Sequence, residues 1–168
     1  MNDQKTELMD AAALKSNFPA IEFAYPIAIN SYDVLAKRIE AIDNKLQTQT
    51  ALMISLFVVI PTLLKAQGTA YFSLWFYLSM LLLVIGIVIS IYARYVGTLK
   101  VLNPNTLKEH YIQFEEYIFK YEMILHAGDA YTANHKLVER KWHNLVYSLI
   151  SFSLAMVSLV VWVTVSQF

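Results

Sequence analysis

Residues 66–93 read AQGTAYFSLWFYLSMLLLVIGIVISIYA, and no charged side chain interrupts them. About 20 apolar residues in a helix cross the hydrocarbon core of a bilayer, which is about 30 Å thick. This stretch therefore predicts a membrane-spanning helix at about 71–94. The whole chain fits the same class of protein, because its mean hydropathy is +0.45 and only 15% of its residues are charged. Soluble domains have about 25% charged residues.

Two more stretches are candidate spans. After His143 no charged side chain follows, which predicts a span at about 145–166. Residues 46–64 are also uncharged, although the first of them are polar and Pro61 lies near their end. We expect a span here at about 46–65, because it would form a hairpin with the next span through a short turn. The alternative is a re-entrant or interfacial segment.

Lysine and arginine residues are concentrated before the first span and between the second and third spans. Such residues stay on the cytoplasmic side of a membrane. We therefore expect a multi-pass protein of the inner cell membrane, with a cytoplasmic N-terminus and a C-terminus outside.

The basic segments carry helical patterns of their own. After Ser31, apolar residues recur at spacings of three and four, which is an a/d seam. The pattern predicts a cytoplasmic helix at about 31–46 that continues to residue 64. The seam residues are Tyr32, Leu35, Ile39, Ile42, Leu46, Gln49 and Met53.

Two further cytoplasmic helices are predicted at about 105–127 and 129–144. Gly128 suits the left-handed position after a helix, and Asp129 is a good cap for the next one. The first seam is Leu107, Tyr111, Phe114, Ile118, Tyr121 and Leu125. The second seam is Tyr131, His135, Val138, Trp142 and Leu145, and it continues into the span as Leu149, Phe152 and Met156.

These elements predict an all-α membrane protein. Three transmembrane helices carry long cytoplasmic extensions, which pack as an antiparallel coiled bundle. The second span should continue to about Leu99. Residues 30–168 then form one helical membrane domain, and residues 1–29 form a separate N-terminal arm, because Pro19 and Pro26 should break any helix there.

Small residues recur at helical spacing in two of the spans, as Gly86, Ser90, Ala93 and Gly97, and as Ser148, Ser151, Ala155 and Ser158. Small residues let membrane helices approach closely. Two interpretations are open, namely packing within one chain, or an oligomer interface or pore lining. Polar residues of the first span would be costly facing lipid and would also suit a pore. The candidate pore-lining or interface residues are Gln49, Ser55, Thr62, Gly86, Ser90, Ser148, Ser151 and Ser158.

Basic residues near the inner membrane face are candidates for binding a nucleotide or oligonucleotide, because phosphates need positive partners. They are Lys37, Arg38, Lys45, Lys136, Arg140 and Lys141. The alternative is simple anchoring to anionic lipid headgroups.

We expect no enzymatic activity, no metal site and no cofactor. The chain has no cysteine, and its histidines, at 110, 126, 135 and 143, offer no pair four residues apart on a helix. No serine has a nucleophile-elbow context. No ionisable side chain lies deep in a predicted span, which argues against a proton relay or an ion-coupled transporter.

The helix from Tyr32 to Leu46, its continuation through Ala51–Leu64, the following membrane hairpin and the later cytoplasmic helix resemble the SLATT family. These are small bacterial membrane effectors associated with nucleotidyltransferases in conflict and anti-phage systems. The resemblance covers about residues 30–166. It implies an oligomeric pore that disrupts the membrane of an infected cell, controlled by a nucleotide or oligonucleotide signal or by a partner protein.

Three functions are open from the sequence. The first is a homo-oligomeric pore-forming effector or ion channel, gated through the cytoplasmic helices. The second is a non-conducting membrane adaptor that anchors a cytosolic partner protein. The third, a membrane enzyme or transporter subunit, would need intramembrane charge or metal-ligand spacing, and the sequence has neither.

Overall fold

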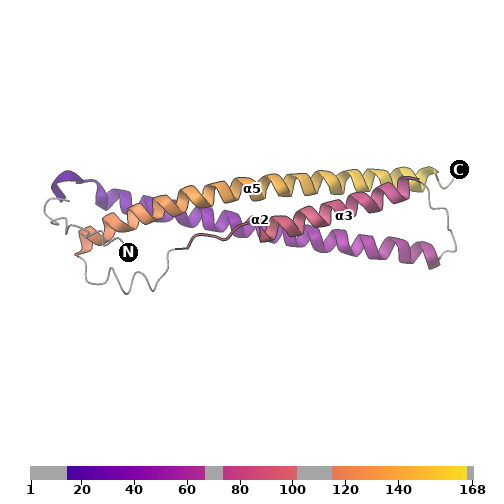
Figure 1. The fold of residues 1–168 in the computed structure, drawn as a ribbon, viewed down its shortest axis with the longest axis horizontal. Helices are drawn as coiled ribbons and strands as arrows, with labels where there is room; N and C mark the ends of the chain where they lie inside the picture. Colours follow the sequence, from indigo (N-terminus) through magenta and orange to yellow (C-terminus); the bar gives the residue numbers. More distant parts are fainter. Residues whose placement is uncertain (1–14, 67–73, 102–114, 166–168) are drawn as a thin grey trace, which may run out of the picture. The chain divides into compact units, whose positions relative to one another are not determined.

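The computed structural model describes residues 15–66, 74–101 and 115–165, with the side chains of 63–66 excepted. In these ranges the chain is helical apart from short connecting segments, and no strand occurs. The helices are α2 (Ile21–Ala66), α3 (Leu74–Tyr95) and α5 (Glu116–Val165), drawn in Figure 1. The predicted all-α fold is confirmed.

Helix α2 begins earlier than predicted. The Ile21 amide donates to the Phe18 carbonyl at 3.2 Å, and the helix then runs through Pro26 to Ala66. A proline removes one backbone donor, and Pro26 does so in the second turn of α2 without ending the helix. The prediction that Pro26 breaks the helix, and that an arm extends to residue 29, is therefore wrong. The predicted break at Pro19 is confirmed, because Pro19 lies in the turn just before α2. Residues 1–14 of the predicted arm lie outside the described residues.

Helix α5 is one unbroken helix where two were predicted. It passes through Gly128 and Asp129 without a turn, so the predicted boundary between 127 and 129 is wrong, and these two segments form no antiparallel hairpin. A glycine in a helix costs only about 1 kcal/mol relative to alanine. Burial of Ala127 and Ala130 on either side offsets that cost. The predicted helix start near 105 lies outside the described residues.

Helix α3 ends at Tyr95, short of the predicted end at Leu99. Gly97 follows with a φ of 77°, which is the left-handed conformation that terminates many helices. An added Cβ at this position would lie 2.6 Å from Cδ1 of Leu137. Gly97 therefore ends the helix, and it does not extend the small-residue stripe of the span.

The chain forms two compact units, and both α2 and α5 contribute to each of them. The first unit contains α2 up to Lys37, α5 up to Lys136 and the chain from Leu99. The second contains Arg38–Thr98 and Leu137–Phe168.

In the first unit, Asn134 connects α5 to the chain that follows α3. Its side chain is only 1% exposed. Its Oδ1 accepts from the Lys100 amide at 3.0 Å, and its Nδ2 donates to the Lys100 carbonyl at 3.1 Å. Tyr32 of α2 donates to the same carbonyl at 3.2 Å. The Lys100 carbonyl thus accepts from both α2 and α5, and it joins three segments of this unit.

The start of α2 contacts the start of α5 through a charged cluster in the same unit. Lys120 pairs with Glu22 at 2.6 Å and with Glu116 at 2.7 Å. The hydrogen bonds that Lys120 donates to these two carboxylates raise the pKa of Lys120 to about 12. The bond to Lys120 lowers the pKa of Glu116. Beside the cluster, the rings of Phe18 and Tyr121 lie 5.4 Å apart.

In the second unit the three helices pack around small apolar clusters. Ile42 and Leu46 of α2 meet Ala93 of α3 and Leu145 of α5. Further along α2, the next cluster joins Met53, Leu83 and Ala155. From the first cluster to the second, the residue numbers increase in both α2 and α5 and decrease in α3. Helices α2 and α5 are therefore parallel here, and α3 is antiparallel to both.

The predicted seam of α2 is confirmed almost completely. Its residues Tyr32, Leu35, Ile39, Ile42, Leu46 and Met53 are all buried. The predicted seam of α5 is wrong in part, because Trp142 and Leu149 are about half exposed. Leu145 is buried as predicted, and the partly buried Val138 and Phe152 pack against the core clusters. The residues that α5 buries are Met123, Ala127, Ala130, Asn134, Leu137, Lys141, Leu145, Ser148, Ser151, Ala155, Ser158 and Trp162.

Two of the described helices, α3 and α5, are long and apolar enough to cross a membrane. In each, only 28% of the most apolar window is buried inside the structure, whereas the core helix of a soluble protein is mostly buried. The exposed surface of α3 consists of large apolar residues, such as Leu81, Ile85 and Val88. This pattern favours membrane association. Helix α2 is not one of the two, and its span stays a prediction.

Candidate functional site

Ser148 is the centre of a buried polar network where the three helices of the second unit meet. Its hydroxyl donates to the Gly86 carbonyl at 2.9 Å. It also accepts from Nε2 of Gln49 at 3.0 Å and lies 2.6 Å from the hydroxyl of Ser90. Ser148 and Ser90 are fully buried. One hydroxyl thereby joins α2, α3 and α5.

Two more serines bond α3 to α5 along the same stripe. Ser151 donates to the Leu82 carbonyl at 2.7 Å, and Ser79 donates to the Ala155 carbonyl at 2.9 Å. Each small side chain lets a backbone approach closely enough to accept the bond. The fit is tight, because a Cβ added to Gly86 would lie 2.8 Å from the sulfur of Met53.

This network places five of the predicted pore-lining or interface residues inside one chain. Gly86, Ser90, Ser148, Ser151 and Ser158 are all buried between the helices. Of the two interpretations left open by the sequence, packing within one chain is the one that describes this conformation. A pore or oligomer role for these residues stays a prediction, and it requires the three helices to rearrange.

The three predicted residues of α2 lie in different environments. Gln49 joins the network, but its Oε1 is buried and has no hydrogen-bond partner in the described part of the chain. Ser55 and Thr62 are exposed, and their hydroxyls donate to the carbonyls of Ala51 and Val58 in the same helix. Such bonds satisfy a hydroxyl that faces lipid. The sequence argument that these two residues need a pore is therefore weakened.

Lys141 is engaged in a buried ion pair at the polar end of the network. Its side chain is 3% exposed, and Nζ lies 2.6 and 2.9 Å from the two carboxylate oxygens of Asp43. The ammonium also reaches the Arg94 carbonyl at 3.4 Å, near the end of α3. A cation is favourable at the C-terminus of a helix. Lys141 thus joins the same three helices, and it is not accessible to a nucleotide in this conformation.

The other predicted ligand-binding residues are exposed, and the two units divide them. Lys37 and Lys136 belong to the first unit. Arg38, Lys45 and Arg140 belong to the second. The described residues hold no group of three or more acidic, histidine or cysteine side chains that could bind a metal ion.

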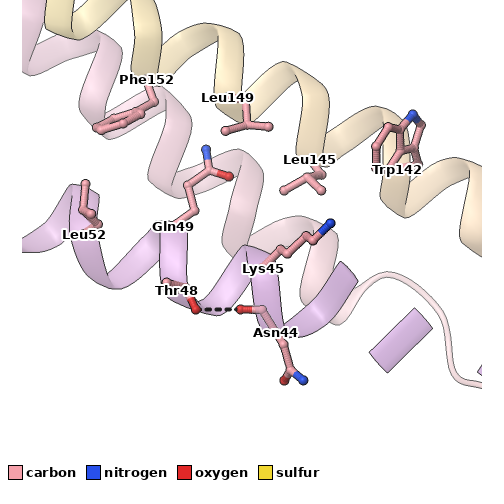
Figure 2. Close-up of a pocket in the computed structure, with 9 residues that line it drawn as sticks. All are labelled: Asn44, Lys45, Thr48, Gln49, Leu52, Trp142, Leu145, Leu149 and Phe152. Carbon is pink, nitrogen blue, oxygen red and sulfur yellow. Dashed lines mark hydrogen bonds between the residues drawn. The ribbon is translucent and has the colours of Figure 1, made fainter. Parts of the chain in front are cut away.

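A groove between α2 and α5 opens beside the network. Its part shown in Figure 2 has a volume of about 490 Å³. The figure shows the Gln49 side chain pointing from α2 toward α5, close to Leu145 and Leu149. An adjoining part of about 540 Å³ is lined by Arg38, Ala41, Ile42, Lys45, Val138, Glu139, Trp142 and His143. Lys45 and Trp142 line both parts.

Sequence reasoning missed Asp43, Asn134 and Ser79. Asp43 and Asn134 are polar residues outside the predicted spans, where exposure is the usual outcome. The available signal was spacing, since Asn134 and Lys141 lie on the stripe that leads to Leu145 and Ser148. The same signal was available for Ser79, which precedes Leu83, Gly86 and Ser90 at spacings of four, three and four.

Comparisons with protein-family models, with curated proteins and with solved structures find no match for this chain.

Proposed function

We propose that this protein is a three-span membrane protein that assembles into an oligomeric pore or ion channel, gated through its cytoplasmic helices. The N-terminus would be cytoplasmic and the C-terminus outside, in the inner cell membrane. The observation that carries the proposal is the continuity of α2 and α5, which run unbroken from a charged segment into an apolar one. A movement imposed on the charged part of an unbroken helix is passed to the part inside the bilayer.

The polar network supports a conducting state. Gln49, Ser90 and Ser148 place neutral polar groups between apolar helices, and the buried Oε1 of Gln49 has no partner in the described structure. Burying such a group without a hydrogen bond is costly. Separation of the helices would hydrate this group, so water and then ions would gain a polar path.

The resemblance to SLATT proteins supplies a biological setting for the same proposal. In that setting the pore acts in anti-phage defence, and the gating signal is a nucleotide or oligonucleotide made by a partner nucleotidyltransferase. Exposed Arg140 is the receiving residue that we favour on α5. Lys141 is excluded because Asp43 already binds it.

A second candidate function is a non-conducting membrane adaptor. Two observations favour it, namely a span interior whose serines are already bonded and an exposed apolar surface on α2 of the first unit. On that surface Phe23 is 77% exposed and Ile27, one turn later, is 66% exposed. Exposed apolar surface of this kind often binds another protein.

Ion conductance of the full chain in a planar bilayer separates the two candidates, provided that the oligomeric state is determined on the same preparation. A channel gives unitary currents from a defined oligomer. Arg140→Gln should then keep the current and lose its response to added oligonucleotides, whereas Lys37→Gln should keep both. Silent bilayers with and without nucleotides would overturn the channel proposal and support the adaptor.

A further inference from the structure

The groove between α2 and α5 changes in chemical character along its length. Among the described residues, all those that line it belong to these two helices, and none belongs to α3. Arg38 and Lys45 supply exposed cations toward one end. Leu52, Leu149 and Phe152 form an apolar wall at the other end. Its two parts, of about 490 and 540 Å³, are each within the range of about 300–1,000 Å³ that is usual for small-molecule sites.

This change runs in the direction in which the predicted spans enter the membrane. The cationic end belongs to the segments that precede the predicted spans, and the apolar end belongs to the spans themselves. Trp142 lies where the two parts join, and it is 50% exposed. Tryptophan favours the level of the lipid headgroups, where one end of the ring is wet and the other is apolar.

We infer that the groove binds one anionic phospholipid of the cytoplasmic leaflet. The phosphate would face Arg38 and Lys45, and an acyl chain would lie along Leu52, Leu149 and Phe152. Glu139 also lines the cationic part, so the cations exceed the carboxylates there by two to one. Basic pockets between membrane helices on the cytoplasmic side suit anionic headgroups. The inference requires membrane insertion but does not depend on ion conduction.

Charge also argues against a second copy of the chain as the occupant. A symmetric dimer through this groove would bring the same surface of both copies together. Arg38 and Lys45 of one copy would then face the same two cations of the other. An anionic lipid offsets these charges, whereas a symmetric partner adds to them.

Fluorescence of Trp142 tests the inference in the full-length protein. The variant Trp75→Phe with Trp162→Phe leaves Trp142 as the single tryptophan. Trp162 packs 5.3 Å from the ring of Phe76, so phenylalanine keeps an aromatic ring in that contact. The protein is reconstituted in vesicles that contain either phosphatidylglycerol or phosphatidylcholine with brominated acyl chains, at equal mole fractions. We expect stronger quenching by the brominated phosphatidylglycerol.

Matched charge variants show whether the groove itself is responsible. Removing one cation near an anionic surface should lower affinity roughly fivefold, which corresponds to about 1 kcal/mol. Arg38→Gln with Lys45→Gln should therefore abolish the preference for phosphatidylglycerol. Lys37→Gln with Lys136→Gln removes the same charge from exposed residues that do not line the groove, and it should keep the preference. Arg38→Lys with Lys45→Arg should also keep it.

Three outcomes would overturn the inference. Equal quenching by the two lipids in the single-tryptophan protein would do so, and so would an unchanged preference after Arg38→Gln with Lys45→Gln. The third is absence of quenching by either lipid, together with disulfide-linked dimers of a Trp142→Cys variant, which would make the groove a contact between copies. The chain has no other cysteine, so that readout is unambiguous. A silent bilayer would count against the channel proposal alone.

Discussion

Gly97 and Gly128 occupy opposite backbone environments. Gly97 has a φ of 77° and faces Leu137 closely, whereas a Cβ at Gly128 would meet no atom within 4 Å. Gly128 lies inside α5, where its backbone is helical. Glycine is therefore required at the first position, while at the second it adds only conformational freedom to the unfolded chain.

We expect the same substitution to have opposite effects at these two sites. Gly128→Ala should raise stability by about 0.5–1 kcal/mol, because alanine suits a helix interior and loses less entropy on folding. Gly97→Ala should lower stability by about 1 kcal/mol or more, because alanine is strained at positive φ and its Cβ would clash with Leu137. Thermal unfolding in detergent, followed by circular dichroism, measures both. If Gly128→Ala also destabilised, a helix end at 127 would be correct after all.

The sequence did not distinguish these two glycines. Gly128 precedes Asp129, a strong N-cap residue, so a local pattern favoured a turn. Gly97 continued the spacing of a small-residue stripe, so a local pattern favoured a helix. In each case tertiary packing decided the outcome, through Ala127 and Ala130 beside Gly128 and through Leu137 beside Gly97.

At the scale of the helices, the pair of Asp43 and Lys141 connects α2 to α5. Asp43→Ala should destabilise the protein by about 3 kcal/mol, because it leaves the buried Lys141 ammonium without its partner. Adding Lys141→Met should restore most of that loss, since the long apolar side chain removes the charge and keeps the volume. Thermal unfolding of the single and double variants measures the coupling. Equal destabilisation by the single and the double variant would contradict the expectation.

The charged contact between the starts of α2 and α5 should respond to pH. The pKa of Lys120 is raised to about 12, above the lysine pKa of about 10.4 in an unfolded chain. Its ion pairs therefore stabilise the fold fully below a pH of about 10.4, and this stabilisation is lost as the pH rises through about 12. The pKa of Glu116 is lowered below the glutamate pKa of about 4.3 in an unfolded chain. Its stabilising contribution is therefore present above a pH of about 4.3 and is lost as the pH falls through its lower pKa in the folded protein. Between these limits the contact should be constant.

Hydrogen exchange of amides at the start of α2, corrected for intrinsic rates, measures this response. Protection at Phe23 and Ala24 should stay level across neutral pH and fall toward both extremes. Lys120→Met is the matched control, because it removes both ion pairs and should flatten the profile. A steady change of protection through neutral pH would show that another group controls this contact.

The seams of α2 and α5 show how much of an element can be predicted. In α2 the large apolar residues form the buried stripe, so the choice of the most apolar spacing was correct. In α5 the exposed side is also apolar, and most of the largest residues lie there. Helices in lipid pack through small and polar residues because burial gives no hydrophobic advantage over lipid contact. The stripe of Ser148, Ser151, Ala155 and Ser158 was therefore the better guide.

At the scale of the whole molecule, the number of spans determines on which side each end of the chain lies. With three spans, a cysteine at Lys37 and a cysteine at Val165 lie on opposite sides of the membrane. A membrane-impermeant maleimide should label Val165→Cys in intact cells and Lys37→Cys only after lysis. If α2 is re-entrant, both positions lie on the same side and label together. That result would contradict the three-span prediction while keeping α3 and α5 as spans.

The class of the molecule follows from composition and charge placement, which predicted the all-α fold and the apolar stretches that became α3 and the end of α5. The network around Ser148 could not be predicted in the same way. A serine stripe is compatible with a pore and with close packing, and the distinction depends on which helix lies opposite. That information comes from contacts such as those of Ser148 with Gly86 and Gln49.

Helix α3 is fixed lengthwise against α5 at both of its ends. Ser79 bonds to the Ala155 carbonyl, and the Arg94 carbonyl accepts from Lys141. With 22 residues, α3 is about 33 Å long, slightly more than a hydrocarbon core of about 30 Å. If α3 spans a bilayer as predicted, it cannot adapt to a thinner one by sliding along its neighbour. The packed helices must tilt together, or the lipid around them must stretch, so bilayer thickness acts on them as a single mechanical load.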